Sequence, residues 1–455
     1  MNKKCRILFY NTDQMGVNYY RTLMPALDLD KQYSDDFYVE INPNINFDDP
    51  EILTYLTSFD IIHYHKELYD VRKYHNYRKA LKDAGTILVM DIDDYWELSK
   101  THPMYLNFVQ NKIHMLVMKT LQFADYVTTT TELLAAEVRK VTGKDNVIVL
   151  PNAIDPDNMD QFQNNWVPDP DGRVRITYMG GSSHLQDLMQ LEGVVNVLNA
   201  DTSIKDKFKI ILAGWDDRGK TSDINFNPEF LEDLKKANLF EPKTVKEINK
   251  AKGELGNIAR IPKKIKEKYT KDDVYVKSER DLTAPESIYN KYEQILTDSQ
   301  RIITDRTYIS FLHKYDKNGR YAPEGNFARR WTQSSNKYAN VLNETDIVLA
   351  PLEDNMFNRM KSNLKQVECW SRKLPIICSD MPPYDVDGRD MDNCILISTE
   401  KNAKKYWIKA LKRLIYDADL RKQLGEQLFL DFKDKYHLST VNKIRAEFYK
   451  RITNV

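Results

Sequence analysis

Residues 346–384 read DIVLAPLEDNMFNRMKSNLKQVECWSRKLPIICSDMPPY. Residues 346–350 form a short apolar run of the kind that a strand buried on both faces requires, and Pro351 ends it. A polar loop follows, and we expect a helix to begin near Ser362, whose hydroxyl can cap its first turn. Residues 375–379 form a second apolar run. The segment therefore predicts a strand, a loop, a helix and a strand, with the loop at the sheet edge where ligands bind in open α/β folds.

The start of this predicted helix offers the chemistry that a nucleoside diphosphate requires. Backbone N–H groups at a helix N-terminus attract phosphate, and Lys361 and Lys365 can add full positive charges. Glu368 follows on the same helix, where a carboxylate can accept hydrogen bonds from two vicinal sugar hydroxyls. The alternative is an ordinary βαβ unit with two solvated lysines, and the segment alone favours that alternative.

The pattern PLxxNxFNxxKSxLKxxE…LPII.S…PPY within residues 351–384 resembles the nucleotide-sugar glycosyltransferases with GT-B architecture. It is most similar to the large retaining group that carries a Glu-x7-Glu signature. Glu368 matches the second Glu, which in that group binds the donor ribose, whereas Met360 stands where the first Glu belongs. KSxLK replaces the usual glycine-containing turn, as in divergent members that include some phage-like ones, and the role of the first carboxylate stays open. The resemblance implies a nucleotide-sugar site that includes Lys361, Ser362, Asn363, Leu364, Lys365 and Glu368.

The composition of the whole chain sets limits on its class. With 455 residues, the chain is long enough for two or three domains that each have a core. Lys and Arg together number 67, as do Asp and Glu, so no net charge indicates nucleic acid or a membrane as partner. The four cysteines show no CxxC spacing, which favours a reducing compartment and no structural zinc. Without a signal sequence or an apolar run of about 20 residues, we expect a cytoplasmic protein with no membrane span.

The first elements of the chain predict a Rossmann-like opening. Residues 5–10 are an apolar strand, followed by a loop that contains Gly16 and by a helix through Leu29. The sequence GVNYYR after the strand is not GxGxxG, so its residues could simply form a helix face. The resemblance places this loop in the cleft that faces the donor domain, which makes Gly16 and Arg21 site candidates.

Polar residues follow two further predicted strands of the first domain. Residues 60–65 end with His63 or His65 exposed, and residues 86–90 lead into the carboxylates at 91–94. These acids could cap a helix in solvent or orient an acceptor sugar. A metal site is a weaker third reading, because the retaining enzymes that the chain resembles need no metal. We name His65, Asp93, Asp94 and Arg21 as catalytic candidates and expect no metal ligand.

The second domain is predicted to begin with a strand over residues 173–179 and a turn at Gly180, Gly181 and Ser182. Two glycines directly after a strand let backbone amides approach a phosphate, so these three residues join the candidate nucleotide-sugar site. Residues 208–213 are the next strand. A strand over 394–397 and amphipathic patterns around 407–415 and 441–452 follow later.

Residues 216–328 exceed what two Rossmann-like halves need. Residues 241–280 contain 12 Lys and Arg against 7 Asp and Glu, which indicates either a solvated insertion or a basic surface for an anionic acceptor such as DNA or a charged polysaccharide. Within and after this insertion we predict helices over 289–301 and 331–342 and a strand over 308–312.

The predicted fold class is α/β, with two Rossmann-like domains facing across a GT-B cleft and a largely helical insertion in the second. We expect an acceptor domain over 1–165, a nucleotide-sugar domain over 170–435, and a helix within 438–455 that crosses back to the first domain. The predicted activity is metal-independent, retaining transfer of a hexosyl or related group from a nucleotide diphosphate sugar, with no further cofactor. The acceptor could be a glycan, a protein or modified nucleic acid. A GT-B epimerase and an inactive binding or structural protein are the alternatives, and the oligomeric state stays open.

Overall fold

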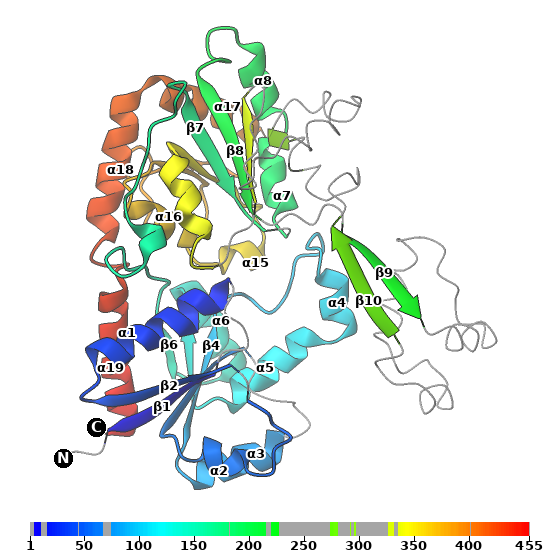
Figure 1. The fold of residues 1–455 in the computed structure, drawn as a ribbon, viewed down its shortest axis with the longest axis vertical. Coiled ribbons are helices and arrows are strands. Elements are labelled where there is room, and N and C mark those ends of the chain that lie inside the picture. The colour runs from blue at the N-terminus through cyan, green and yellow to red at the C-terminus, as the bar shows by residue number, and fades with distance from the viewer. Residues whose placement is uncertain are drawn as a thin grey trace.

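The computed structural model describes residues 4–10, 16–43, 45–66, 74–181, 183–214, 220–226, 274–280, 292, 295–296, 326–331, 335–400 and 402–454. Figure 1 shows two α/β units, one above the other, each built around its own sheet. Each sheet has six strands, and all of its pairings are parallel. The predicted α/β class with two Rossmann-like units is therefore confirmed.

The N-terminal unit has the strand order β2-β1-β3-β4-β5-β6. Its strands are apolar because helices cover both faces of the sheet, as parallel sheets require. They are β1 (Cys5–Tyr10), β2 (Phe37–Asn42), β3 (Ile61–His65), β4 (Ile87–Ile92), β5 (Tyr126–Thr129) and β6 (Val147–Val149). The helices are η1 (Tyr19–Leu23), α1 (Met24–Gln32), α2 (Ile52–Leu56), α3 (Tyr74–Asp83), α4 (Tyr105–Gln110), α5 (Ile113–Phe123) and α6 (Glu132–Thr142).

The C-terminal unit has the strand order β11-β8-β7-β12-β13-β14. Its strands are β7 (Val174–Met179), β8 (Phe208–Gly214), β11 (Phe327–Trp331), β12 (Ile347–Ala350), β13 (Ile376–Ser379) and β14 (Ile395–Ile397). The helices are η3 (Asp160–Phe162), α7 (Leu185–Leu188), η4 (Met189–Leu191), α8 (Val194–Ala200), η7 (Tyr338–Glu344), α15 (Met356–Arg359), α16 (Leu364–Trp370), α17 (Ala403–Tyr416) and α18 (Ala418–Phe432).

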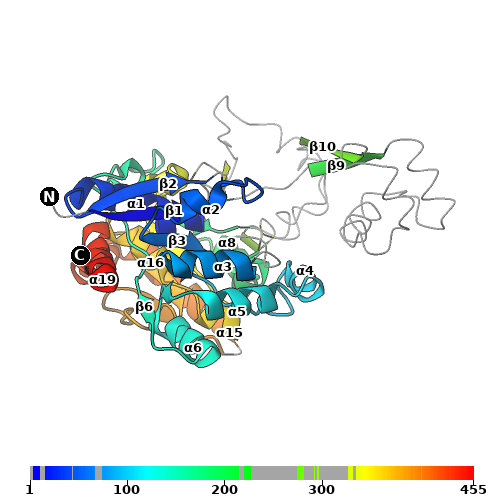
Figure 2. The same ribbon diagram turned by 90° about the horizontal axis from the view of Figure 1, so that it is seen from below.

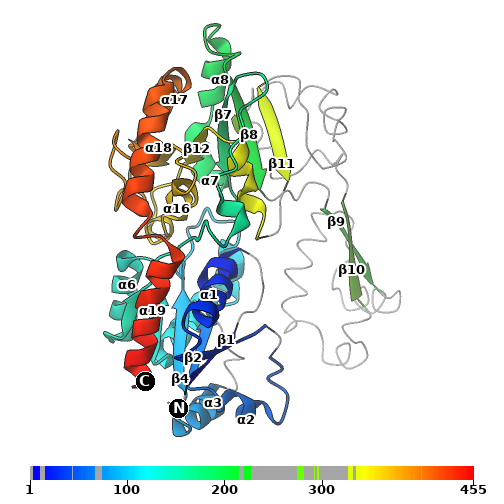
Figure 3. The ribbon, with the colours of Figure 1, turned by 60° about the vertical axis from the view of Figure 1, so that its left-hand side comes forward.

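Two segments connect the units, and they pair with each other where they cross. Ile154, on the segment after β6, forms a parallel bridge with His437, on the segment after α18. The Ile154 N–H donates to the Tyr436 carbonyl at 3.1 Å, and the Leu438 N–H donates to the Ile154 carbonyl at 2.9 Å. The chain then continues into α19 (Leu438–Thr453), which Figure 3 shows running from the upper unit along the lower one.

The helix α19 packs on the N-terminal unit. Its Phe448 and Tyr449 are buried in one cluster with Ile7 and Phe9 of β1. The Asn442 amide donates to the Pro25 carbonyl at 2.9 Å. The last helix of the chain is therefore part of the first unit's core.

The predicted insertion contains a two-stranded antiparallel ribbon, β9 (Lys220–Phe226) with β10 (Val274–Arg280), which Figure 2 shows apart from both sheets. Of the predicted helix over 289–301, Tyr292, Ile295 and Leu296 are described, and they are helical and buried in the C-terminal core. The predicted strand over 308–312 lies outside the described residues.

Two predicted elements have other bounds or another type than expected, and one helix was missed. The strand expected to end at Met90 continues to Ile92, so Asp91 lies within the strand instead of after it. Trp331 ends the edge strand β11 rather than starting a helix, and the helical turns of that region begin at Tyr338. The helix α18 was not singled out from the sequence. Among the described residues, no helix combines the length and apolar character needed to cross a bilayer.

Candidate functional site

Glu368 lies on α16 between the two units and is fully buried. Its Oε1 accepts a hydrogen bond from the Tyr20 hydroxyl at 3.0 Å and another from the Tyr338 hydroxyl, and the two hydroxyls touch. Its Oε2 lies 2.8 Å from Lys365 Nζ. Burial raises the pKa of both tyrosines well above the usual value, and the nearby Glu368 raises it further, so both remain protonated donors at neutral pH. The carboxylate thus binds one hydroxyl from each unit.

The start of α16 differs from the prediction. The helix begins at Leu364, and the preceding Asn363 makes no side-chain cap hydrogen bond. Ser362, expected as the cap, instead accepts a hydrogen bond at its Oγ from the Asn152 amide at 2.8 Å, and the Asn363 amide donates to the Tyr436 hydroxyl at 2.8 Å. Both side chains therefore fix the start of the helix to the two segments that connect the units.

Met360, which precedes this helix, occupies the position of the first Glu in the Glu-x7-Glu signature. Met360 is buried and packs in the core cluster of the N-terminal unit, beside residues such as Ile92 and Trp96. A carboxylate there would be desolvated without an evident cation, which makes an apolar side chain the compatible choice. Lys361 places its Nζ over the Phe357 ring, 4.7 Å from the ring centroid. Position 360 is thus a contact between the units.

The glycine turn after β7 is held by close backbone contacts. Gly214 has φ +140, and a Cβ there would collide with the Gly180 carbonyl oxygen. The Tyr292 hydroxyl donates to the Gly181 carbonyl at 2.9 Å. Glycine is therefore needed at position 214 because another part of the backbone passes directly over it. Ser182, the third residue expected in this turn, lies outside the described residues.

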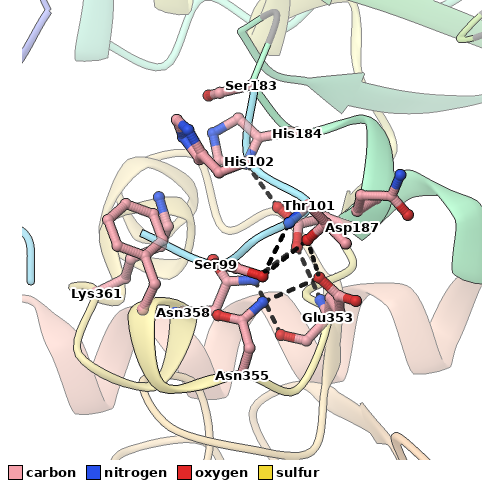
Figure 4. Close-up of a pocket in the computed structure, with 12 residues that line it drawn as sticks. Ser99, Thr101, His102, Ser183, His184, Asp187, Glu353, Asn355, Asn358 and Lys361 are labelled. Carbon is pink, nitrogen blue, oxygen red and sulfur yellow. Dashed lines mark hydrogen bonds and ion pairs between the residues drawn. The ribbon is translucent and has the colours of Figure 1, made fainter. Parts of the chain in front are cut away.

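Asp187 links the segment after that turn to the loop after β12. Its Oδ2 lies 2.7 Å from His184 Nδ1, and its Oδ1 accepts hydrogen bonds from the Glu353 backbone N–H at 2.8 Å and from the Asn358 amide at 2.7 Å. Figure 4 shows this network. The Thr101 hydroxyl, from the N-terminal unit, donates to Glu353 Oε2 at 3.3 Å. Hydrogen bonds thus link the segment after the glycine turn to the loop after β12, and this loop contacts the N-terminal unit.

A small pocket of about 20 Å³, enough for one water, lies between the units at this network. Its walls come from both units and include one residue of the predicted donor site, Lys361. They are Ser99, Thr101, His102, Ser183, His184, Gln186, Asp187, Glu353, Asn355, Phe357, Asn358 and Lys361.

A second, larger cavity of about 460 Å³ lies next to it on the N-terminal unit. This volume is in the range of small-molecule sites. The two spaces share His102 and Phe357, so they adjoin. The larger one is mostly apolar and aromatic, and its lining includes the polar side chains of His65, Lys66 and Asp94.

His65, Asp93 and Asp94 come together at the ends of β3 and β4. His65 Nε2 and Lys66 Nζ both lie 2.8 Å from Asp93 Oδ1, and Lys66 Nζ lies 3.9 Å from Asp94 Oδ2. Burial alone would raise the pKa of Asp93, but Lys66 and then His65 outweigh it and hold that pKa well below its usual value. An ionised Asp93 therefore orients His65 at the wall of the larger cavity.

Arg21 does not reach this cavity. Two guanidinium nitrogens donate to Asp91, Nε to Oδ2 at 3.0 Å and Nη2 to Oδ1 at 2.7 Å. The third, Nη1, donates to the Leu150 carbonyl at 2.6 Å. Both residues are fully buried, and Thr128 Oγ1 also donates to Asp91 at 2.6 Å. Arg21 therefore joins η1 to β4 and to the segment after β6 inside the N-terminal unit.

Gly16 and His63, also named from the sequence, line neither pocket. His63 is buried, not exposed at the strand end, and its Nδ1 lies 2.8 Å from the Tyr449 hydroxyl of α19. Burial lowers the pKa of His63 to about 3, so it is neutral at physiological pH. Gly16 has φ +54 and is exposed at the start of the segment that leads into η1.

The acids at 91–94 do not gather metal ligands in the described part of the chain. Among the described residues, the one group with three close ligand atoms is Asp155, Asp157 and His437, where the connecting segments cross. Asp155 Oδ1 there already accepts hydrogen bonds from the backbone N–H groups of Asp157 and Asn158.

Comparison with solved structures identifies the architecture. HepE from Anabaena in complex with UDP-glucose superposes with a TM-score of 0.55 at 11% identity, over 98% of this chain and 99% of that one. Sucrose-phosphate synthase from Thermosynechococcus elongatus gives 0.54 at 10% identity, over 99% of this chain and 100% of that one. The chain has the GT-B fold. A glycosyltransferase from Rickettsia africae matches over 99% of both chains with a TM-score of 0.52 and 11% identity.

At the level of sequence, no family model and no curated protein matches this chain. The GT-B likeness is therefore one of fold, at identities of 10 to 11%.

Several residues of the site were not predicted from the sequence. Tyr20 and Tyr338 carry no motif, and their hydroxyls meet Glu368 only because the two units come together. Lys66 follows directly after His65, so a search for cations beside the predicted acids would have found it. His102 lies in a polar stretch after β4 and had no distinguishing pattern.

Proposed function

We propose that the protein transfers a sugar from a nucleoside diphosphate sugar to an acceptor, with the donor at the start of α16 and the acceptor in the larger cavity of the N-terminal unit. The observation that carries the proposal is the setting of Glu368. In this GT-B fold its Oε1 accepts hydrogen bonds from two hydroxyls, the arrangement that a ribose diol would provide. The solved complex of HepE with UDP-glucose supports a UDP-sugar as the donor to test first.

The donor needs the two units to separate at Glu368. One of the hydroxyls on its carboxylate, that of Tyr20, belongs to the N-terminal unit, whereas Tyr338 and Lys365 belong to the same unit as Glu368. A hinge at the paired crossing segments near Ile154 and His437 would withdraw the Tyr20 hydroxyl and leave Glu368 Oε1 able to accept another hydrogen bond. The ribose then takes that position, and closure excludes water from the donor.

We assign the diphosphate to Lys361 and Lys365. The helix α16 has 7 residues, so its backbone dipole is short and the two ammonium groups supply most of the positive charge. Negative charge grows on the diphosphate as the glycosidic bond breaks, and cations placed there stabilise that transition state more than the ground state. The turn at Gly180 and Gly181 lies after β7 of the same sheet and adds backbone groups.

On the acceptor side, we propose that His65, held by Asp93 and beside Asp94, positions the attacking hydroxyl. Retention at the anomeric carbon and independence from metal follow from the resemblance of residues 351–384 to the retaining group. The acceptor domain would then span residues 1–165 and the donor domain residues 170–435.

The test is a thermal-shift screen followed by a turnover assay. UDP and UDP-glucose should raise the melting temperature, since a ligand that binds the folded state stabilises it. Slow release of UDP from UDP-glucose should persist in EDTA, and the released sugar should keep its anomeric configuration by NMR. A sugar interconversion without UDP release would identify an epimerase, and no stabilisation by any nucleotide or nucleotide sugar would contradict the proposal.

A further inference from the structure

The helices α4 and α5, with the residues before α4, have a composition unlike the rest of the chain, and we call residues 98–124 the α4–α5 segment. The segment contains no Asp or Glu, whereas the whole chain has 67 of them in 455 residues. It contains Lys100, Lys112 and Lys119, all exposed. A positive charge without compensating acids is therefore built into this segment.

The α4–α5 segment also exposes large apolar side chains. No residue of α4 is buried. Leu106 is 68% exposed, Val109 48%, Met104 45% and Met115 43%. Figures 1 and 2 show α4 at the outer edge of the N-terminal unit, beyond α5. We call this surface, formed by Met104, Leu106, Val109, Met115 and the three lysines, the α4–α5 patch.

The patch adjoins the cavity that we assign to the acceptor. The cavity lining includes five residues of the α4–α5 segment, namely Leu98, His102, Phe108, Ile113 and Val117. A partner bound to the exposed side chains of this segment is therefore next to the space in which the acceptor would lie.

We propose that the α4–α5 patch docks on an anionic lipid surface, so that the acceptor is one presented at a membrane. Exposed apolar side chains that enter the interface, together with lysines that face anionic headgroups, are the features of peripheral membrane contact. Nucleic acid fits less well, because phosphate contacts are polar and leave Leu106 and Val109 without a role. A symmetric contact between two copies of the patch would bring like charges together. The choice of acceptor rests on the proposed function, whereas the docking does not.

The test is co-sedimentation of the full chain with vesicles of phosphatidylcholine, with and without phosphatidylglycerol. We expect binding to the mixed vesicles and much weaker binding to pure phosphatidylcholine. Substituting Leu106→Ser with Val109→Ser, or Lys112→Glu with Lys119→Glu, should each reduce partitioning about tenfold or more. These side chains are exposed and line neither pocket, so the fold and the donor site should be unaffected.

Matched controls carry the same changes elsewhere. Val386→Ser with Leu430→Ser alters two side chains of similar exposure, 63% and 54%, in the C-terminal unit. Lys409→Glu with Lys443→Glu makes the same change in charge outside the patch. Neither control should change vesicle binding.

Equal binding of the parent and the patch variants, or no binding to the anionic vesicles, would overturn the proposal. Binding to duplex DNA that only the lysine variant weakens, without vesicle binding, would overturn it in favour of nucleic acid. UDP stabilisation is measured on the same samples: if it persists while vesicle binding fails, only the docking is refuted. If vesicle binding holds while no nucleotide binds, the proposed transferase function fails and the docking stands.

Discussion

Tyr20→Phe tests whether the contact between the units competes with the donor. The change removes the hydroxyl that donates to Glu368 Oε1 at 3.0 Å and keeps the ring, which packs beside Tyr19 and Phe162. Tyr338 and Lys365 still contact the carboxylate in the variant. The substitution therefore weakens the closed arrangement without leaving Glu368 unpaired.

The size of the effect follows from the charge of the acceptor. A hydrogen bond to a charged group contributes about 1.5–3 kcal/mol, and the remaining partners of Glu368 place the loss at the lower end of that range. If donor binding requires this bond to break, its removal favours the open state by about 1.5 kcal/mol, which is roughly a tenfold increase in UDP affinity. The unliganded protein should at the same time unfold more readily by a similar free energy.

Isothermal titration of UDP and thermal unfolding measure both quantities. Tyr19→Phe is the control, because Tyr19 lies on the same turn and has no hydrogen bond to Glu368. Unchanged UDP affinity in Tyr20→Phe would refute the competition. Weaker affinity would mean that Tyr20 contacts the bound nucleotide, which also contradicts the reasoning.

Three other outcomes follow from the structure. Asp91→Asn should cost about 3–5 kcal/mol of unfolding free energy in chemical denaturation, because it leaves the Arg21 guanidinium buried without its counter-charge. Burial alone would raise the pKa of Asp91, but Arg21 outweighs it and lowers that pKa to about 2, below the value of about 3.9 in an unfolded chain. The stabilisation by the ion pair is therefore complete above the unfolded value and is lost as pH falls toward 2. Acid unfolding of the parent should show this loss, and the Asn variant should not. Lys361→Ala and Lys365→Ala should each weaken UDP binding about tenfold by titration and lower the transfer rate, whereas an effect on neither would place the diphosphate elsewhere. Gly214→Ala should lower stability by about 1–3 kcal/mol in thermal unfolding and weaken donor binding, since its Cβ would collide with the Gly180 carbonyl; a neutral result would mean that the glycine turn tolerates displacement.

The strands were the most predictable part of the chain, for a local reason. A strand buried on both faces needs an uninterrupted apolar run, and β1 over Cys5–Tyr10 coincides with the predicted one. β12 and β13 each begin one residue after the predicted start. Trp331 shows the limit of this signal, because the edge strand that it ends reads Phe-Ala-Arg-Arg-Trp and has no uninterrupted apolar run.

The site was less predictable because its partners are distant in sequence. The contact of Arg21 with Asp91 was not expected from the sequence, because it depends on Asp91 being inside β4, and the strand's length cannot be read from the apolar run alone. Ser362 is a good cap by residue type, yet its Oγ is taken by Asn152 from another segment. Tyr20 and Glu368 are separated by 348 positions and meet only through the arrangement of the two units.

The central claim is that Glu368 binds the donor ribose, and a comparison of two nucleotides tests it most directly. UDP and 2′,3′-dideoxyuridine diphosphate are titrated into the parent and into Glu368→Gln. The parent should prefer UDP about ten- to a hundredfold, because a charged hydrogen bond to the ribose contributes about 1.5–3 kcal/mol. Any general loss of stability in the variant affects both nucleotides alike, so the ratio isolates the contact. We predict that the preference falls about tenfold in Glu368→Gln, because the amide oxygen still accepts a hydrogen bond but the charge is lost; an unchanged preference would show that the ribose binds elsewhere.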